Sequence, residues 1–145
     1  MNIIPMTIAT ANKFVANFHR HNKKVHGAKF AIGLAEEGEL IGVAIAGRPI
    51  ARMLDNGHTI EILRVCVKEQ FKNSNSKLYA RIKRICQLMG YEKIITYTLN
   101  NESRSSLKAI GAKQVSETKP GEWSRSRRRR TSQRIYSQTK LRWEL

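Results

Sequence analysis

The sequence predicts a single mixed α/β domain, a β-sheet flanked by helices in the order β-α-β-β-β-α-β-α-β. Several short apolar runs are rich in β-branched residues and end at Gly, Pro, Asn or Asp, which is typical of strands. Other segments repeat apolar residues at spacings of three and four, which indicates helices. The 145 residues are enough for one core but not for two, so the whole chain, 1–145, is predicted to be one domain.

The first two predicted elements are a short strand and a helix. Residues 2–5 are predicted to form the strand, and Thr7 is a suitable N-cap for the helix. Apolar positions then recur on one helical face: Ile8, Ala11, Phe14, Val15 and Phe18. The helix is predicted to end in a polar, basic stretch over residues 19–27.

Three strands are predicted next. The apolar runs 29–35 and 39–46 flank Glu36-Glu37-Gly38, which predicts a β-hairpin with a short turn. Pro49 ends the second run, because proline has no N–H to donate to a strand ladder. After a connection, residues 59–67 are predicted to form a buried strand.

The second half of the chain is predicted to alternate between helix and strand. A turn at 71–76 leads into a helix that ends at Gly90. The apolar face of this helix consists of Leu78, Ile82, Ile85 and Met89. Residues 93–99 are predicted to form a strand and 102–110 a short helix. A basic segment with few apolar anchors occupies 119–134, and the last strand is expected within 135–145.

The charge balance is the most unusual feature of the composition. The chain has 27 Lys and Arg against 11 Asp and Glu, a formal net charge of +16. A positive field of this size favours polyanionic partners, and nucleic acid is the leading candidate. An acidic lipid or a phosphorylated cofactor could bind part of this positive charge. The alternative is a protein that is basic without having a polyanionic partner.

Cysteine usage and hydropathy favour a reducing cytoplasm as the expected location. Cys66 and Cys86 lie in apolar segments, too far apart for a zinc motif or a disulfide framework. The opening MNIIPMT is too short for a signal sequence, and no apolar run approaches the length of a membrane span. We therefore expect no membrane partner.

The turn FKNSNS at 71–76 raises a specific question about function. It joins a buried strand to a helix and holds two Asn and two Ser but no Gly. The first N–H groups of a helix lack partners and carry positive potential, so small residues here suit a phosphate. The alternative is ordinary helix capping by Asn75 or Ser76.

The order of elements resembles that of the GNAT acyltransferases. A resemblance over nearly the whole chain points to a phage- and prophage-associated group of GNAT-like proteins, distantly similar to the phage DNA-modification protein Mom. It is carried by HRH (19–21), KFAIG (29–33), GVAIAGRP (42–49), NSNSKLY (73–79), GYEKIITYTL (90–99), SLKAIGA (106–112) and the ending KLRWEL. The resemblance implies an acyltransferase that uses acetyl-CoA or a related acyl donor.

The resemblance also implies where the donor binds. In GNAT enzymes the fourth strand leads into a loop Arg/Gln-x-x-Gly-x-Gly/Ala that cradles the coenzyme A pyrophosphate. Gln70 matches this pattern, but Asn73 and Asn75 stand in place of the glycines. The implied cofactor-binding residues are Cys66, Val67, Gln70, Lys72, Asn73, Ser74, Asn75 and Ser76. At Cys66 and Val67 a backbone N–H would polarise the acyl carbonyl.

Glu61 is the candidate general base, because it is the only acid within the predicted strand 59–67. The alternative is an exposed or ion-paired glutamate, with Arg64 or Arg48 as partner. Strict alternation does not put Ile60, Ile62 and the later apolar residues on one face, so a β-bulge is expected in this strand.

His19 and His21 offer a second candidate base, since histidine titrates near neutral pH. With a third ligand they could also hold a metal. Residues two apart do not share a helical face, so a metal needs a non-helical segment there. The commoner use of such a basic run is phosphate contact, and we predict no metal site.

The acid that protonates the leaving thiolate has no obvious candidate. GNAT enzymes commonly place a tyrosine in the short helix before the last strands, and the matching residue here is Leu107, which cannot donate a proton. Ser106 is the nearest substitute, and Tyr97 is another candidate.

The segment WSRSRRRRTSQR at 123–134 is the predicted nucleic-acid contact. Its consecutive arginines suit an extended chain that follows a phosphate backbone, and Trp123 could stack on a base. The predicted nucleic-acid-binding residues are Arg48, Trp123, Arg125, Arg127, Arg128, Arg129, Arg130 and Arg134. A solubilising loop or a strip that binds a phosphorylated cofactor is the alternative.

Three functions are compatible with these patterns. The first is an acyltransferase that modifies an amino group on nucleic acid, a DNA base rather than RNA, in phage or prophage biology. The second is a nucleic-acid-binding protein on a GNAT scaffold that has lost its chemistry. The third is an acetyltransferase for a protein or a small amine. The sequence does not indicate an oligomeric state.

Overall fold

The computed structural model describes residues 1–18, 25, 27–99, 105–118 and 140–145. Its strands are β1 (Asn2–Met6), β2 (Ala28–Glu36), β3 (Glu39–Gly47), β4 (Thr59–Val67), β5 (Lys93–Leu99), β6 (Lys113–Thr118) and β7 (Lys140–Glu144). Its α-helices are α1 (Ile8–Phe18), α2 (Asn75–Leu88) and α3 (Ser105–Ala109), and the 3₁₀ helices are η1 (Arg52–Leu54) and η2 (Glu69–Ser74).

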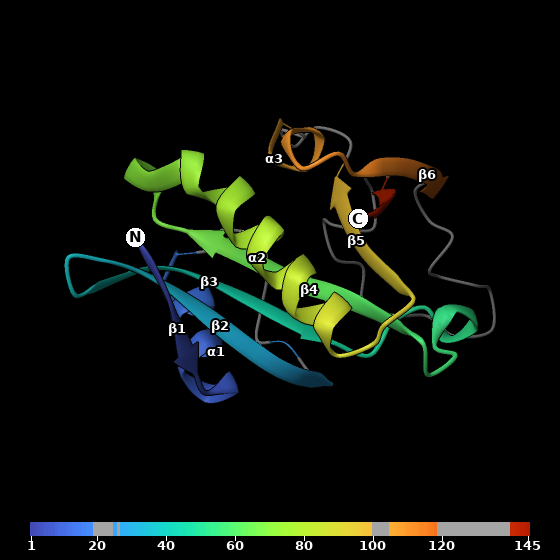
Figure 1. The fold of residues 1–145 in the computed structure, drawn as a ribbon, viewed down its shortest axis with the longest axis horizontal. Helices are drawn as coiled ribbons and strands as arrows, with labels where there is room; N and C mark the ends of the chain where they lie inside the picture. The colour runs from blue at the N-terminus through green and yellow to red at the C-terminus, as the bar shows by residue number, and fades with distance from the viewer. Residues whose placement is uncertain (19–24, 26, 100–104, 119–139) are drawn as a thin grey trace, which may run out of the picture.

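Within the described residues, the strands form one mixed sheet in the order β1-β2-β3-β4-β5-β7-β6. Neighbouring strands are antiparallel except β4 and β5, which are parallel. The predicted mixed α/β class with helices flanking a sheet is confirmed (Figure 1). None of the helices in this part of the chain has the length and apolar character that a membrane crossing requires.

Local signals explain the first elements. The Thr7 hydroxyl accepts a hydrogen bond from the Thr10 N–H at 3.1 Å, so the predicted N-cap of α1 is confirmed. The β2–β3 hairpin turns at Glu37 and Gly38, whose φ angles of 49° and 79° are those of a two-residue turn with both residues left-handed.

Two helices cover opposite faces of the sheet, each above its own core cluster. On one face, Leu78, Ile82 and Cys86 of α2 pack against Ile60 and Ile62 of β4. On the other face, α1 packs its apolar side against β2, β3 and β4 through Ala11, Phe14, Val15, Ala31, Val43, Ile45, Leu63 and Cys66. Figure 1 shows α2 lying across the near face of the sheet.

The end of the sheet differs from the prediction. The sequence predicted no strand at 113–118, yet β6 pairs there with β7. Its only large apolar residue is Val115, which is exposed, so the strand lacks the alternating pattern that would have revealed it. Pairing with β7 in tertiary structure forms this edge strand. The last strand is β7, within the predicted 135–145, and α3 begins at 105 within the predicted 102–110.

The expected β-bulge is present in β4 and is confirmed by the strand register. Ala46 pairs with Ile62, but the preceding Ile45 pairs with Arg64, so Leu63 is the extra residue. Before the bulge, odd-numbered residues of β4 face α1. After it, Arg64 and Cys66 face that side, opposite Ile45 and Val43.

β4 and β5 separate soon after they meet. Their parallel pairing covers only Thr59, Ile60 and Glu61 of β4. Beyond this point the Thr96 hydroxyl donates to the Ile62 carbonyl at 3.0 Å, while β5 continues in pairing with β7. Figure 1 shows the two arrowheads pointing apart. A wedge-shaped gap therefore opens in the middle of the sheet, beginning at Glu61.

Candidate active site

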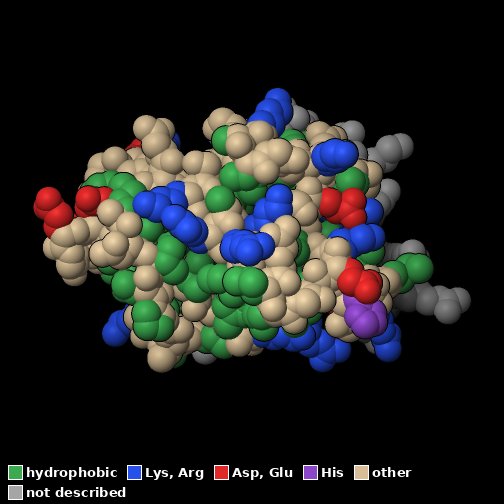
Figure 2. All heavy atoms as spheres, viewed as in Figure 1, with side chains coloured by type: hydrophobic (Ala, Val, Ile, Leu, Met, Phe, Trp, Pro, Cys, Tyr) green, Lys and Arg blue, Asp and Glu red, His purple; other side chains and the backbone are tan. Residues whose placement is uncertain are grey.

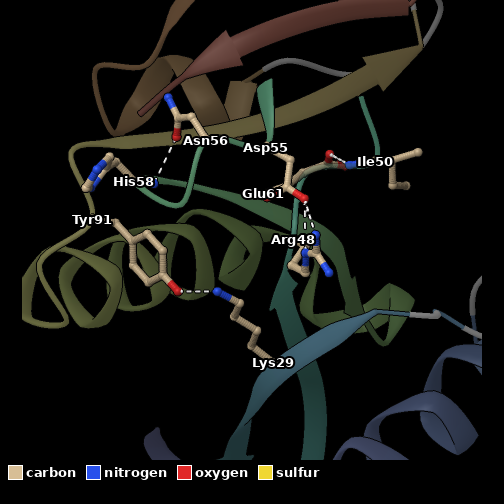
Figure 3. A network of polar contacts seen from close by, with 8 residues as sticks. All are labelled: Lys29, Arg48, Ile50, Asp55, Asn56, His58, Glu61 and Tyr91. Carbon is tan, nitrogen blue, oxygen red and sulfur yellow. Dashed lines mark hydrogen bonds and ion pairs between the residues drawn. The ribbon is translucent and has the colours of Figure 1, made fainter. Parts of the chain in front are cut away.

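The Glu61 carboxyl lies at the point where this gap begins. The residue is only 4% exposed, and its Oε1 accepts a hydrogen bond from the Ile50 N–H at 3.0 Å (Figure 3). Burial raises the pKa of Glu61 from 4.5 to about 7, although the Ile50 N–H and the positive charges of Arg64 and Lys140 lower it in part. Near neutral pH this group can therefore both accept and release a proton.

The residues around Glu61 come from three different strands. Glu61 pairs with Ile95 of β5, and two residues further along β5 lies Tyr97 on the same face of the sheet. Tyr97 pairs directly with Arg142 of β7. The bulge in β4 places Arg64 on this face, and the charge of Lys140 also acts on Glu61. We call this group, Glu61, Arg64, Tyr97, Lys140 and Arg142, the Glu61 cluster.

Tyr97 is a proton donor rather than an anion at neutral pH. Burial and the nearby Glu61 carboxylate raise its pKa, while the Arg142 charge and a hydrogen bond from Arg142 lower it in part. The structure thus brings together two of the predicted catalytic residues, Glu61 and Tyr97.

Sequence reasoning missed Lys140 and Arg142 as site residues and considered Arg64 only as an ion-pair partner. The signal for the first two was present in the alternation of the ending KLRWEL. Leu141 and Trp143 are buried against Leu107 of α3, so Lys140 and Arg142, which alternate with them along β7, must face the other side. Arg64 could not be placed before the position of the bulge was known.

Arg48 is exposed and does not contact Glu61. Its guanidinium donates to Asp55 Oδ2 at 2.7 Å and 3.0 Å, which closes the connection between β3 and β4 (Figure 3). The alternatives in which Glu61 is exposed or pairs with Arg48 are therefore wrong. A nucleic-acid contact of Arg48 stays a prediction.

The predicted phosphate turn is a 3₁₀ helix, η2, that runs directly into α2. The N-cap of α2 is Ser74, and its side chain makes no capping hydrogen bond. Asn75 and Ser76 lie inside the helix, and the Ser76 hydroxyl bonds to the Asn73 carbonyl at 3.3 Å, so capping by either residue is wrong. Gln70, Lys72 and Asn73 are exposed beside this helix start.

These features fit an anionic group at the start of α2. Ser74 makes no capping hydrogen bond, although its hydroxyl donates to Met1 Sδ at 3.4 Å, and the exposed Lys72 lies 3.8 Å from Glu69 in an ion pair. Cofactor binding by residues 70–76 stays a prediction.

Cys66 and Val67 lie on β4 where it has left β5. The Cys66 thiol is buried and its pKa is raised by burial to about 11, so it is protonated at neutral pH and unsuited to act as a nucleophile. In the described residues, the edge of β4 that faces the gap has no strand partner beyond Glu61. This leaves backbone N–H groups on that edge available to an acyl carbonyl.

Ser106 is not brought to the Glu61 cluster. It lies half-buried in α3, and the neighbouring Leu107 packs against Leu141 and Trp143 on the opposite face of the sheet. Several predicted residues lie outside the described ones: His19, His21, Trp123, Arg125, Arg127, Arg128, Arg129, Arg130 and Arg134.

Several solved structures with a similar architecture are acetyltransferases. An IAA acetyltransferase from Bacillus cereus is similar with a TM-score of 0.73 and 16% identity, covering 99% of this chain and 97% of the other. A GNAT-family protein from Desulfovibrio desulfuricans gives a TM-score of 0.70 and 13% identity over 99% and 97%. A Bacillus subtilis acetyltransferase in complex with CoA gives 0.62 and 16% over 94% and 84%.

The sequence itself gives no such match. No protein-family model matches the chain, and no curated protein matches it. The likeness lies in the arrangement of the elements, including the sheet of seven strands in the described residues and the helices on its two faces. The chain therefore has the fold of the GNAT acetyltransferases.

Proposed function

We propose that this protein is an acyltransferase that moves an acyl group from a CoA-type donor, acetyl-CoA or a close relative, to an amino group. The observation that carries the proposal is the buried Glu61 carboxyl, with a pKa of about 7, at the point where β4 and β5 separate. Support for the donor comes from the fold and from the B. subtilis structure, which contains CoA.

The donor would supply an activated acyl thioester to the gap between β4 and β5. The start of α2, with Gln70, Lys72 and Asn73 beside it, would hold the pyrophosphate. Backbone N–H groups near Cys66 and Val67 would stabilise negative charge on the acyl oxygen.

The chain's own residues move the protons. The Glu61 carboxylate takes a proton from the acceptor amine as its nitrogen attacks the acyl carbon and the bond from carbon to sulfur breaks. Tyr97 is the described hydroxyl in the Glu61 cluster and is protonated at neutral pH, so we propose that it supplies the proton to the leaving thiolate.

We propose nucleic acid as the acceptor, an amino group on a DNA base rather than RNA, in phage or prophage biology within the bacterial cytoplasm. The net charge of +16 and the arginine segment support this choice. A base within a duplex would have to be flipped out of the stack to reach Glu61. The fold serves a protein or a small amine equally well as acceptor.

Calorimetric titration of acetyl-CoA tests the donor. The wild type should bind, and a variant carrying Asn73→Glu and Ser76→Glu should lose binding, because two carboxylates at the helix start repel the pyrophosphate. Glu61→Gln should bind the donor normally but lose at least about a hundredfold in turnover. Absence of binding to the wild type would contradict the donor and favour a non-catalytic nucleic-acid-binding protein.

Mass spectrometry of nucleosides tests the acceptor. Expression of the wild type in bacteria should produce a modified base that cells with Glu61→Gln lack. An unmodified nucleoside pool, together with acylation of a protein or a small amine, would move the acceptor to that class.

A further inference from the structure

The face of the sheet that carries Glu61 has more cations than a neutral or cationic acceptor would need. Alternation along β7 places Lys140 and Arg142 on this face, since Leu141 and Trp143 are buried on the other. The bulge in β4 adds Arg64. The Glu61 cluster therefore combines three positive side chains with a single carboxyl group.

Among the described residues, a second acidic group on this face is already paired with a cation of its own. Glu144 lies on the same face, paired with Ile95, but its carboxylate forms an ion pair with Lys93 at 3.3 Å. That pair is neutral as a unit. With Glu61 ionised, the cluster keeps a net charge of +2 by count of its described side chains.

Lys140 connects the charges of β7 electrostatically to those of β4. β5 lies between β4 and β7 in the sheet, yet the electrostatic partners of Lys140 include Glu61 and Arg64, both on β4. Lys140 therefore lies within electrostatic range of the β4 side chains where β4 and β5 separate. Its positive charge acts on the same carboxyl group that an acceptor amine would have to reach.

We propose that Arg64, Lys140 and Arg142 form an anion-binding site that holds a phosphate of the acceptor, with its amine directed to Glu61. A guanidinium offers paired N–H donors that match phosphate oxygens, and Arg142 is already oriented by its hydrogen bond to Tyr97. The net charge of +16 makes a nucleotide or a nucleic acid the phosphate source that fits best. As an acceptor site this rests on the proposed acyl transfer, but phosphate binding can be measured without it.

Equilibrium binding of a labelled single-stranded oligodeoxynucleotide and of deoxyadenosine monophosphate tests the site. Arg142→Met should weaken both by about tenfold or more, because a charged hydrogen bond is lost. Arg142→Lys should recover part of the affinity. Arg84→Met is the matched control, since it removes one exposed guanidinium from α2 on the opposite face of the sheet and should have a much smaller effect.

The results distinguish local recognition from the general positive field. Equal losses in Arg142→Met and Arg84→Met would overturn the proposal. If only the oligonucleotide binds, the phosphate comes from a polymer, and if the mononucleotide binds comparably, a nucleotide suffices. Should Arg142→Met fail to fold, Lys140→Met takes its place with the same expected loss.

A competition between acceptors separates this inference from the proposed function. With acetyl-CoA present, an amine-bearing nucleotide should be acylated in preference to its nucleoside, and spermidine should be a poor acceptor. Preference for spermidine or a lysine peptide would overturn the inference while leaving acyl transfer intact. Local phosphate binding without any acetyl-CoA binding would instead overturn the proposed function and leave the anion site standing.

Discussion

At the scale of single residues, Glu61 shows how a fold creates a reactive group from an ordinary one. A glutamate in water is ionised well below neutral pH. Here burial at the separation of two strands removes most of that hydration, and only one backbone N–H and nearby cations compensate. The result is a carboxyl group that titrates where a general base works best.

Glu61 should make stability fall as pH rises. Its folded-state pKa of about 7 lies above the unfolded value of 4.5, so folding favours the protonated form and this stabilisation is lost between about pH 4.5 and 7. Glu61→Gln has no such loss. Between pH 4.5 and pH 8, the free energy of unfolding of the variant, measured in urea, should therefore rise by roughly 3 kcal/mol relative to that of the wild type. A difference between the two that does not change with pH would contradict this.

Gly47 should tolerate no side chain. A Cβ at this position would overlap the Gly27 carbonyl oxygen and lie 2.8 Å from Ala28 Cα, and backbone atoms cannot move aside cheaply. Gly47→Ala should lower the free energy of unfolding by about 2–3 kcal/mol, measured by urea denaturation.

The control for Gly47 is Gly57→Ala. Gly57 has open space around it and a φ of +83°, so the cost there is backbone strain alone, about 1 kcal/mol. A smaller loss for Gly47→Ala than for Gly57→Ala would show that β2 and β3 can move apart.

At the scale of elements, the central feature is the early separation of β4 from β5. Strand pairing stops at Glu61, and the bulge at Leu63 turns Arg64 onto the same face. The buried Ile62 carbonyl would then lack a ladder partner, and the Thr96 hydroxyl supplies one. This side chain lets the sheet open without leaving that carbonyl unsatisfied.

Thr96→Val tests this role. Valine keeps the shape of threonine but cannot donate, so the variant should lose about 1–3 kcal/mol of unfolding free energy through the unpaired Ile62 carbonyl. Thr96→Ser retains the hydroxyl and should recover most of the hydrogen-bond contribution. Chemical denaturation of the three proteins measures the difference, and a stable Thr96→Val would mean that the carbonyl finds another partner.

At the scale of the whole molecule, the main feature is the large excess of positive over negative side chains. Figure 2 shows Lys and Arg side chains spread over the face that α2 covers, with acidic side chains lying toward its two ends. The formal net charge of +16 adds a long-range attraction for any polyanion, independent of the Glu61 cluster.

Nucleic-acid binding should therefore depend steeply on salt. If the protein neutralises three or more phosphates, affinity for a single-stranded oligonucleotide should fall by at least about tenfold between roughly 50 and 200 mM salt, because counterions are released on binding. Replacing Arg127, Arg128, Arg129 and Arg130 with Gln should reduce the slope. Affinity that does not change with salt would contradict an electrostatic contact.

Much of the fold could be predicted from the sequence, because local patterns encode it. The strand 59–67 and the strand 93–99 have the predicted bounds, since each is a compact β-branched run with clear ends. The N-cap at Thr7 was likewise predictable from its own side chain. β6 was not, because an edge strand with one exposed apolar residue owes its existence to pairing with β7.

The sequence by itself determined the order of the elements except β6, the basic character of the chain and the presence of an acid in the central strand. Only the tertiary structure decided that Glu61 is buried, that β4 leaves β5 beside it, and that Tyr97, Lys140 and Arg142 share its face. The physical reason is how far apart in the sequence the interacting residues lie. Periodicity and caps act between neighbours in the chain, whereas the pKa and the charge of this site depend on residues brought together from strands far apart in sequence.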